Sequence, residues 1–286
     1  MAVKIITDSA CDLPQDLIRE YDIEVVPLLV VMDGKEYADG QDISPEHVYS
    51  AIRAGKVLTT NQAPAHFFRR VFTECVARGM SCIYIAFSSK LSGTCHTGMM
   101  VARQVREETQ GDIEVVDTLC GSLGQGLLVL EAAKMAKAGA GKEQIVARVQ
   151  ELARHMEHIF TVDDLEYLRR GGRIGRASAY VGNLLNIKPL LHVKEGLMIP
   201  IEKVRGKKKA IKRLVELVEE RCSNFRQTIG IAHADDVTAA QYLKELLQTK
   251  FGCKDIIVNV VGSVLGCHIG LGGVAVFFLN KALAAT

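Results

Sequence analysis

Hydroxyl side chains are concentrated in residues 88–94, a segment with three serines and one threonine. The nearly unbroken apolar run 83–87 precedes it and is typical of a strand buried on both faces of a parallel sheet, and a helix-like stretch follows. Hydroxyls and free amides at the carboxyl end of such a strand commonly bind an anion. Because helix capping alone explains two of the hydroxyls, the segment is either an anion site or a capped helix start.

Catalysis is a second chemistry open to this segment. Ser92 is a candidate nucleophile, but the chain has no Gly-x-Ser-x-Gly motif and spacing identifies no triad partner. Cys95 and His96 are adjacent in sequence, which does not place them in contact. A stand-alone serine hydrolase or acyltransferase acting on acyl substrates, with Ser92 and His268, is therefore the alternative function.

Three further segments have residue types suited to binding. Residues 58–64 form a second hydroxyl and amide cluster, in a polar loop before the amphipathic stretch 65–78. His268 lies in a glycine-rich segment that precedes the last strand, where glycine lets the backbone approach another group, so His268 is either structural or a ligand contact. Residues 121–126 fit neither nucleotide-binding glycine motif, which favours close packing of a helix on the sheet.

Cationic side chains cluster at two places in the second half. Residues 169–176 contain four arginines among three glycines, and three lysines occupy 207–209 at a helix start. The first cluster is either a solvated turn or an anion contact, because unpaired guanidiniums are not buried. Nucleic-acid binding through both clusters is a third possible function, but a formal net charge of +2, 6% aromatic residues and no Trp do not favour it.

Composition indicates an ordinary globular protein. With 286 residues, 48% of them hydrophobic, we expect two domains. Eighteen consecutive apolar residues do not occur and the N-terminus shows no signal-peptide pattern, so a soluble cytoplasmic protein is expected. The eight cysteines include no Cys-x-x-Cys pair, which predicts mostly reduced, buried thiols and no metal site.

The elements that position these residues follow from periodicity and turn signals. In the first half, Asp12 is expected to cap a helix whose first turn contains Pro14, and Asp33-Gly34 to form a hairpin turn. Strand and helix alternation predicts an N-terminal α/β domain with a mostly parallel sheet. The expected strands are 3–6, 23–32 with a break at Pro27, 35–37, 83–87 and 113–116, and the expected helices 44–54, 65–78, 94–109 and 121–137.

A long helix at 142–156 is expected to connect this domain to the second one. There a hairpin beside crossover connections predicts a mixed-sheet α+β domain, so the domains are 1–157 and 158–286. The expected strands are 158–162, 188–193, 198–204, 227–232, 256–260 and 274–279, and the expected helices 165–168, 178–186, 207–222 and 237–250, with 262–273 a glycine-rich segment.

Taken together, four pieces in sequence order resemble the DegV family of bacterial fatty-acid-binding proteins. They are Ile6-Thr7-Asp8-Ser9 with Asp12-Leu13-Pro14, residues 88–94, Leu165-Glu166-Tyr167-Leu168 with Arg170-Gly171-Gly172-Arg173-Ile174-Gly175, and residues 266–272. The resemblance spans almost the whole chain. It implies a two-domain α/β protein that holds one long-chain fatty acid between its domains. It also implies that the protein is the binding subunit of a fatty acid kinase and presents the carboxylate to a separate ATP-dependent kinase, without a cofactor and without being the catalyst.

The resemblance also implies roles for single residues. Thr60, Ser92 and His268 would contact the carboxylate, and Arg170 would be their neighbour. Arg173 and Arg205 are candidates for kinase docking or for contact with the added phosphate. The chain departs from the family pattern in two places: the family usually has Thr-Ser-Gln-Pro-Ser where this chain has Thr60-Asn61-Gln62-Ala63-Pro64, and proline where this chain has Leu271.

Physical chemistry agrees with this division of roles. Burial of an acyl tail contributes about 0.8 kcal/mol per methylene, so roughly fourteen methylenes give about 11 kcal/mol before the cost of association. A carboxylate removed from water needs hydrogen bonds, which hydroxyls and an imidazole can donate without a tight salt bridge. We therefore expect the tail to supply affinity and the polar cluster to supply orientation.

Overall fold

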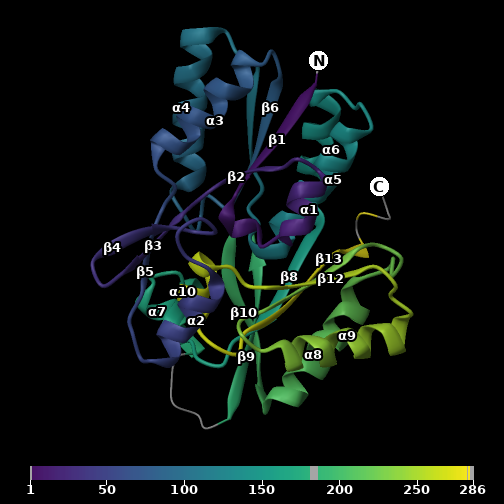
Figure 1. The fold of residues 1–286 in the computed structure, drawn as a ribbon. Helices are drawn as coiled ribbons and strands as arrows, with labels where there is room; N and C mark the ends of the chain where they lie inside the picture. Colours follow the sequence, from purple (N-terminus) through teal and green to yellow (C-terminus); the bar gives the residue numbers. More distant parts are fainter. Residues whose placement is uncertain (1, 181–185, 282, 284–286) are drawn as a thin grey trace.

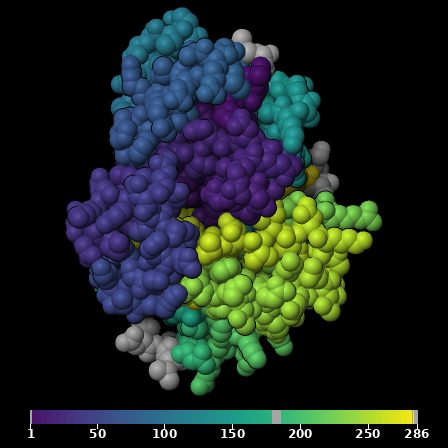
Figure 2. All heavy atoms as spheres, in the orientation of Figure 1, coloured from purple at the N-terminus to yellow at the C-terminus, as the bar shows by residue number. Residues whose placement is uncertain are grey.

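The computed structural model describes residues 2–180, 186–281 and 283. It is an α/β protein with a parallel sheet in the N-terminal region and a mixed sheet in the C-terminal region, as predicted. The first sheet lies above the second in Figure 1, and α6 (Lys142–His155) ends directly before β8 (Met156–Thr161), which belongs to the second sheet. Figure 2 shows purple N-terminal segments directly against yellow C-terminal ones, so the two ends of the sequence pack together.

The parallel sheet has the strand order β2-β1-β6-β7. Every residue of its central strand β6 is buried, which explains the apolar run in the sequence. Helices α3 and α4 lie on one side of it and α5 and α6 on the other (Figure 1). The strands are β1 (Val3–Asp8), β2 (Glu24–Val26), β6 (Ser81–Ala86) and β7 (Ile113–Asp117), and the helices α3 (Ala65–Ala77), α4 (Thr94–Thr109) and α5 (Ser122–Lys137), with α6.

A small antiparallel sheet with the order β4-β3-β5 contains the predicted hairpin. Asp33 and Gly34 form its turn with φ values of 53° and 75°, the left-handed region that such a tight turn requires. Pro27 separates β2 from the next strand. Residues 58–64 were predicted to be a polar loop, but the first part of this segment is strand β5, which pairs with β3. The elements are β3 (Leu29–Met32), β4 (Lys35–Ala38), α2 (Pro45–Arg53) and β5 (Thr59–Asn61).

The second sheet has six strands in the order β10-β9-β8-β13-β11-β12. Only the β11–β12 pair is parallel among the described strands of this sheet, so the predicted mixed sheet is confirmed. Its elements, in chain order and with β8 already given, are β9 (Ile187–Lys194), β10 (Leu197–Arg205), α8 (Lys207–Arg221), β11 (Ile229–His233), α9 (Val237–Phe251), β12 (Ile256–Val260) and β13 (Val274–Leu279).

Side chains on the second sheet alternate between two different environments. Ile159 of β8 packs in the cluster that α8 and α9 cover (Figure 1). Its neighbour Phe160 packs on the opposite face, in a cluster with Phe87 and Leu91 of the N-terminal half. Because successive strand residues point to opposite faces, one face of this sheet is turned toward the parallel-sheet half.

Three local predictions were wrong or incomplete. Pro14, not Asp12, precedes the first turn of α1 (Gln15–Glu20), and Asp12 follows the short 3-10 turn η1 (Ser9–Cys11) with a positive φ of 50°. Part of the glycine-rich segment 262–273 is a helix, α10 (Ser263–Ile269). The helix expected at 178–186 begins as the 3-10 helix η2 (Gly175–Tyr180), and residues 181–185 lie outside the described residues.

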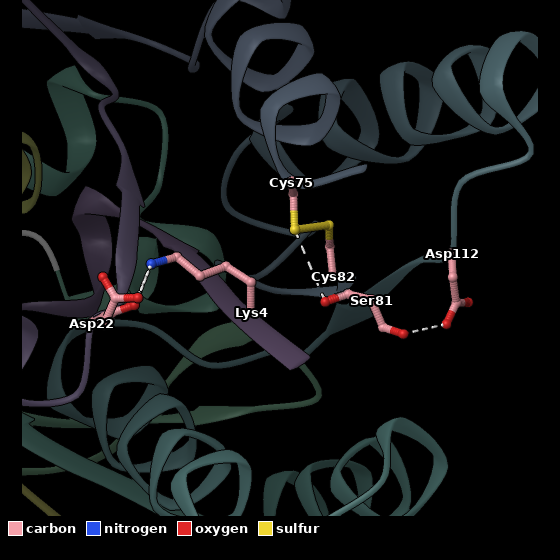
Figure 3. Close-up of a disulfide and its surroundings, with 6 residues drawn as sticks. All are labelled: Lys4, Asp22, Cys75, Ser81, Cys82 and Asp112. Atoms are coloured by element: carbon pink, nitrogen blue, oxygen red, sulfur yellow. Dashed lines mark hydrogen bonds and ion pairs between the residues drawn. A yellow bond between two sulfur atoms is a disulfide. The ribbon is translucent and has the colours of Figure 1, made fainter. Parts of the chain in front are cut away.

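Two of the eight cysteines are joined in the structure. Cys75 of α3 and Cys82 of β6 form a disulfide across the core of the N-terminal half (Figure 3). The other six, all within the described part of the chain, are free and buried, which agrees with the expectation for most of them. Nearby, Ser81 donates a hydrogen bond to Asp112 at 2.7 Å, so β6 is also attached to the start of β7.

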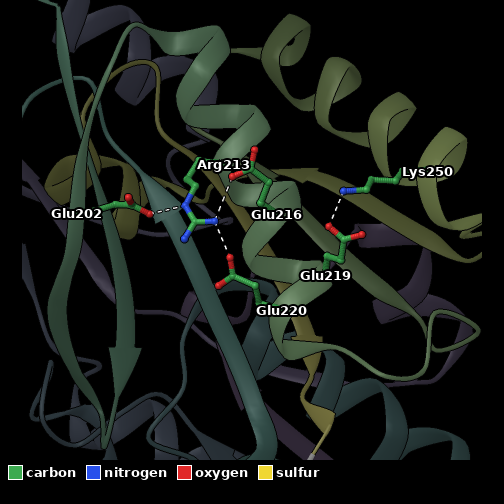
Figure 4. A network of polar contacts seen from close by, with 6 residues as sticks. All are labelled: Glu202, Arg213, Glu216, Glu219, Glu220 and Lys250. Atoms are coloured by element: carbon green, nitrogen blue, oxygen red, sulfur yellow. Dashed lines mark hydrogen bonds and ion pairs between the residues drawn. The ribbon is translucent and has the colours of Figure 1, made fainter.

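Arg213 of α8 is the centre of a surface ion-pair network (Figure 4). Its guanidinium donates to Glu202 of β10 at 2.6 Å, and to Glu216 and Glu220 of its own helix at 3.1 and 2.7 Å. These pairs raise the pKa of Arg213. One cation thus ties α8 to the edge strand and separates three carboxylates.

Arg213→Met should destabilise the protein by about 1 kcal/mol, because three glutamates then face one another without a cation. The loss should shrink at high salt, which screens exposed charges. Urea unfolding at low and high salt measures both effects. Lys250→Met is the matched control, since Lys250 pairs only with Glu219 among the contacts drawn in Figure 4, and it should cost less. An equal loss in the two variants would contradict the network interpretation.

Candidate functional site

An apolar pocket lies between the second sheet and the parallel-sheet half. Its empty volume, which includes the part open to solvent, is about 630 Å³. Both halves of the chain supply its walls. The lining includes Phe87, Leu91 and Gly121 from the N-terminal half, Phe160, Val193, Met198, Ala275 and Phe277 from the sheet, and Leu265, His268 and Ile269 from α10.

His268 is the polar residue of α10 at this pocket, and it contacts the first predicted site residue. Its Nε2 atom and Thr60 Oγ1 of β5 are 2.8 Å apart. Its Nδ1 atom is buried without a hydrogen-bond partner among the described residues, and Gly171 lies against it, where a Cβ would come within 2.0 Å of Nδ1. The structure therefore brings together Thr60, His268 and the glycines that follow α7 (Glu166–Arg170).

The imidazole of His268 is neutral at pH 7. Burial lowers the pKa of His268 to about 4, and the positive charge of Arg173 contributes in the same direction. A neutral imidazole can donate one hydrogen bond to an anion and accept one from a hydroxyl. Of the two polar hydrogens of Thr60 and His268, one is used in the bond between them, so the pair leaves one hydrogen-bond donor for a carboxylate at the end of the apolar pocket.

Ser92 lies in a hydroxyl cluster that adjoins the same place. Its Oγ is 2.9 Å from Thr94 Oγ1 and accepts the backbone N–H of Thr94. The N-cap of α4 is Gly93, which makes no side-chain cap hydrogen bond, so Ser92 contacts the start of the helix without capping it. Thr94 Oγ1 in turn accepts the N–H of Ala63, and Gln62 donates to Thr97. The loop after β5 is thus fastened to the start of α4, which keeps the segments of Thr60 and Ser92 together.

A second hollow adjoins the apolar pocket beside Ser92. Its empty volume is about 700 Å³, and its lining includes Ser92 and Arg173. Leu91 and Met198 line both this hollow and the apolar pocket. The hydroxyl segment therefore lies next to the apolar pocket, with Leu91 and Met198 between them.

The three predicted arginines have different positions. Arg170 pairs with Glu166 at 2.7 Å and is half exposed on α7. Arg173 donates to the backbone carbonyls of Leu91 and Gly171 at 3.0 and 2.6 Å, which places it between the hydroxyl segment and α7. Arg205 is exposed at the end of β10. Arg173, rather than Arg170, is the arginine whose charge acts on His268.

Residues from the start of the chain hold α10 in place. Asp12 accepts the N–H of Gly262, directly before α10, at 2.9 Å, and the hydroxyl of Ser122 at 2.5 Å. Tyr49 of α2 donates to the carbonyl of Val261 at 2.9 Å. Burial raises the pKa of Asp12 to about 8, and the charges of Asp39 and Asp8 act in the same direction.

Sequence reasoning missed these anchors, and also the roles of Gln62, Thr94 and Thr97. The spacing of residues in the sequence carries no signal for contacts between such distant segments. In the structure, the positive φ of Asp12 marks a special backbone position. Residues 121–126 were predicted to let a helix pack closely on a sheet, and this prediction is confirmed at Gly124. A Cβ at Gly124 would come within 2.1 Å of His158, so this glycine permits close packing of α5 on the second sheet.

The alternative chemistries find little support in the geometry. Within the described residues no hydrogen bond joins Ser92 to His268, because Thr94 and Thr60 are their respective partners. Burial raises the pKa of the Cys95 thiol to about 12, which disfavours a thiolate. Among the described residues, no group of three or more His, Cys, Asp or Glu side chains could hold a metal ion, and no helix is long and apolar enough to cross a membrane.

The molecule is thus an α/β protein with an apolar pocket between a parallel sheet and a mixed sheet, and the pocket ends at His268 and its partner Thr60. The chain belongs to the DegV family. The family profile, which describes uncharacterised proteins of that family, matches residues 2–281. A DegV domain-containing protein of Clostridium perfringens is 41% identical over 281 residues, covering 96% of this chain and 97% of the relative.

Two solved structures extend the comparison to the fold. A DegV family protein from Thermus thermophilus, described for its fatty acid binding, superimposes with a TM-score of 0.89 at 34% identity, covering 98% of this chain and 100% of that one. DegV from Bacillus subtilis, described as a fatty acid binding protein, gives a TM-score of 0.86 at 30% identity, covering 98% and 100%. The expected fold class is therefore confirmed, and these relatives bind fatty acids.

Proposed function

We propose that this protein binds one long-chain fatty acid in the bacterial cytoplasm and presents its carboxylate to a separate ATP-dependent kinase for acyl phosphate formation. In this proposal the protein itself is not a catalyst. The acid lies between an N-terminal domain of residues 1–157 and a C-terminal domain of residues 158–286. Its carboxylate contacts Thr60, Ser92 and His268, with Arg170 nearby.

One observation carries the proposal: the apolar pocket ends at a neutral imidazole that already has a hydroxyl partner. The apolar walls suit an acyl tail, which gains free energy with every methylene removed from water. The neutral His268 suits a carboxylate that must be oriented without being trapped, because a hydrogen bond from an imidazole holds an anion less tightly than a buried ion pair does. Fatty acid binding by the Thermus and Bacillus relatives supports the same ligand class.

The kinase step in this proposal is supported by the hollow that Ser92 and Arg173 line. A carboxylate next to this hollow is accessible to a second protein, and guanidiniums are suited to a phosphate added there. Arg173 at that hollow and the exposed Arg205 are the proposed contacts for the phosphate or for the kinase.

Native mass spectrometry of the purified protein tests ligand binding. We expect a copurified mass that matches a C14–C18 fatty acid, and a mixture with a fatty acid kinase and ATP should form acyl phosphate. An empty pocket that also fails to take up added fatty acid would contradict the proposal. Turnover of an activated ester that is lost in Ser92→Ala would instead favour the hydrolase.

A further inference from the structure

Two segments of the chain pack against each other beside His268. The first, which we call the α7 segment, is residues 163–171 and contains α7 (Figure 1). The second, the α10 segment, is residues 268–272, which end α10 and form the loop after it. At one end of their interface Gly171 lies against the ring of His268. The position of the imidazole therefore depends on how the two segments are held together.

Glycines let the two segments approach closely at two further levels. A Cβ on Gly270 would come within 2.3 Å of the Tyr167 ring, and a Cβ on Gly272 within 2.2 Å of Asp163 Oδ2. Both glycines also have positive φ values, of 70° and 79°, which other residues rarely adopt. The residue numbers of these contacts rise along one segment as they fall along the other. The segments are therefore antiparallel and meet at three successive levels.

A lysine from a third element fastens the far end of this interface. Lys207, the first residue of α8, donates hydrogen bonds to the backbone carbonyl of Gly272 and, at 3.1 Å, to Asp163 Oδ1. It therefore binds one group from each segment. Asp236 Oδ2 is 3.3 Å from the same amine, while Asp236 Oδ1 accepts the N–H of Ala239 at 3.0 Å and caps α9. The amine is thus held from the side of α9 as well.

The contacts of Lys207 are largely shielded from water. Its side chain is 23% exposed, and its partner Asp163 has a second cation, Lys188 of β9, at 2.9 Å. Partly buried ion pairs are screened by salt less than exposed ones. A cation at the first residue of a helix opposes the helix dipole, so the stability of α8 alone does not explain a lysine at this position. The amine lies instead where it joins the two segments.

We propose that Lys207 is a positioning residue for His268. By joining Asp163 to the carbonyl of Gly272, it holds the α10 segment against the α7 segment and fixes the orientation of the imidazole. The inference rests on the proposed function, in which the imidazole orients the carboxylate. Loss of the amine should therefore disturb the orientation of the head group more than the affinity for the acid, because the apolar walls of the pocket are unchanged.

Lys207→Met tests this inference, because methionine keeps an unbranched side chain but has no hydrogen-bond donor. With a fatty acid kinase, ATP and saturating fatty acid, acyl phosphate formation should fall about 10- to 100-fold, the cost of a small misplacement, while the dissociation constant of the acid changes less than about threefold. Lys207→Arg keeps the cation and its donors and should recover most of the rate. Lys208→Met removes an exposed cation from the same helical turn and is the matched control, which should behave like the wild type.

A second measurement observes the imidazole directly and needs no kinase. Side-chain NMR of the histidines in delipidated protein should show the ring resonances of His268 shifted or broadened in Lys207→Met and unchanged in Lys208→Met. The exposed His66 of α3 is the internal reference and should be the same in every variant. A lysine that only stabilised the fold would leave the ring of His268 unaltered in the folded variant.

The outcomes separate this inference from the proposed function. Unchanged His268 resonances in folded Lys207→Met overturn the inference whatever the rate, and so do equal losses of rate in the Lys207 and Lys208 variants. If the wild type binds no fatty acid or forms no acyl phosphate, the proposed function fails, and the NMR comparison alone decides the inference. Should Lys207→Met not fold, Asp163→Asn removes the charge of its partner, and an unchanged His268 ring in that variant would equally overturn the proposal.

Discussion

His268→Ala is expected to weaken fatty acid binding about 10- to 100-fold and to abolish measurable acyl phosphate formation with a kinase. A hydrogen bond to a charged group contributes about 1.5–3 kcal/mol, and a carboxylate at the end of an apolar pocket has few substitutes for it. The tail contacts remain, so binding should be reduced rather than lost. Displacement of a fluorescent fatty acid measures the affinity, and the kinase reaction measures the orientation.

Thr60→Val tests whether the imidazole of His268 binds the carboxylate alone or together with the hydroxyl of Thr60. The substitution keeps the side-chain shape but removes the hydroxyl that lies 2.8 Å from His268 Nε2. We expect a smaller loss than for His268→Ala, in the same direction. His66→Ala on the exposed surface of α3 is the matched control and should bind like the wild type. Unchanged affinity in His268→Ala would remove this residue from the carboxylate site.

Asp12→Asn is expected to make the protein more stable than the wild type above about pH 8. The pKa of Asp12 is about 8 in the folded protein, against 3.8 without burial, so between these values the folded state binds more protons than the unfolded state. Wild-type stability should therefore fall as the pH rises from about 4 to 8. Asparagine cannot ionise, yet its oxygen can accept from Gly262 and its amide can donate to Ser122.

Chemical unfolding across pH 5 to 9 checks the slope. The wild type should lose a few kcal/mol over this range, since one pKa unit corresponds to about 1.4 kcal/mol, and the variant should lose less. Some slope should remain, because burial also raises the pKa values of Asp8 and Asp39. Asp16→Asn, on the exposed first turn of α1, should follow the wild type. Parallel curves for wild type and Asp12→Asn would contradict the assignment.

Local signals in the sequence predicted the regular elements well. The helix α4 begins and ends at the predicted residues, because Gly93 and the polar turn before it mark its start and its periodicity is clear. The hairpin at Asp33-Gly34 was predicted by turn chemistry alone. Such elements depend on residues that are neighbours in sequence, so sequence reasoning can find them.

The missed elements depend on partners far away in sequence. Gly266 inside α10 has low helix propensity, and hydrogen bonds that Asp12 and Tyr49 make with the two residues before the helix stabilise its start instead. The pairing of Cys75 with Cys82 needs the turn between α3 and β6, which spacing does not specify. At the site, Thr60 and His268 were associated through family resemblance. No property of either segment by itself indicated that they touch.

The hydrogen bond between Thr60 and His268 spans 208 residues, and this separation has a consequence during synthesis. A ribosome that adds about 5–20 residues per second needs roughly 10 to 40 seconds between these two residues. Late in that interval the strands of the parallel sheet, which end at Asp117, have been made, but α10, whose residues Val264 and Cys267 belong to the same core cluster, has not. A nascent chain that lacks α10 also lacks the contact between Thr60 and His268, so the proposed carboxylate site can form only after residue 268 has emerged.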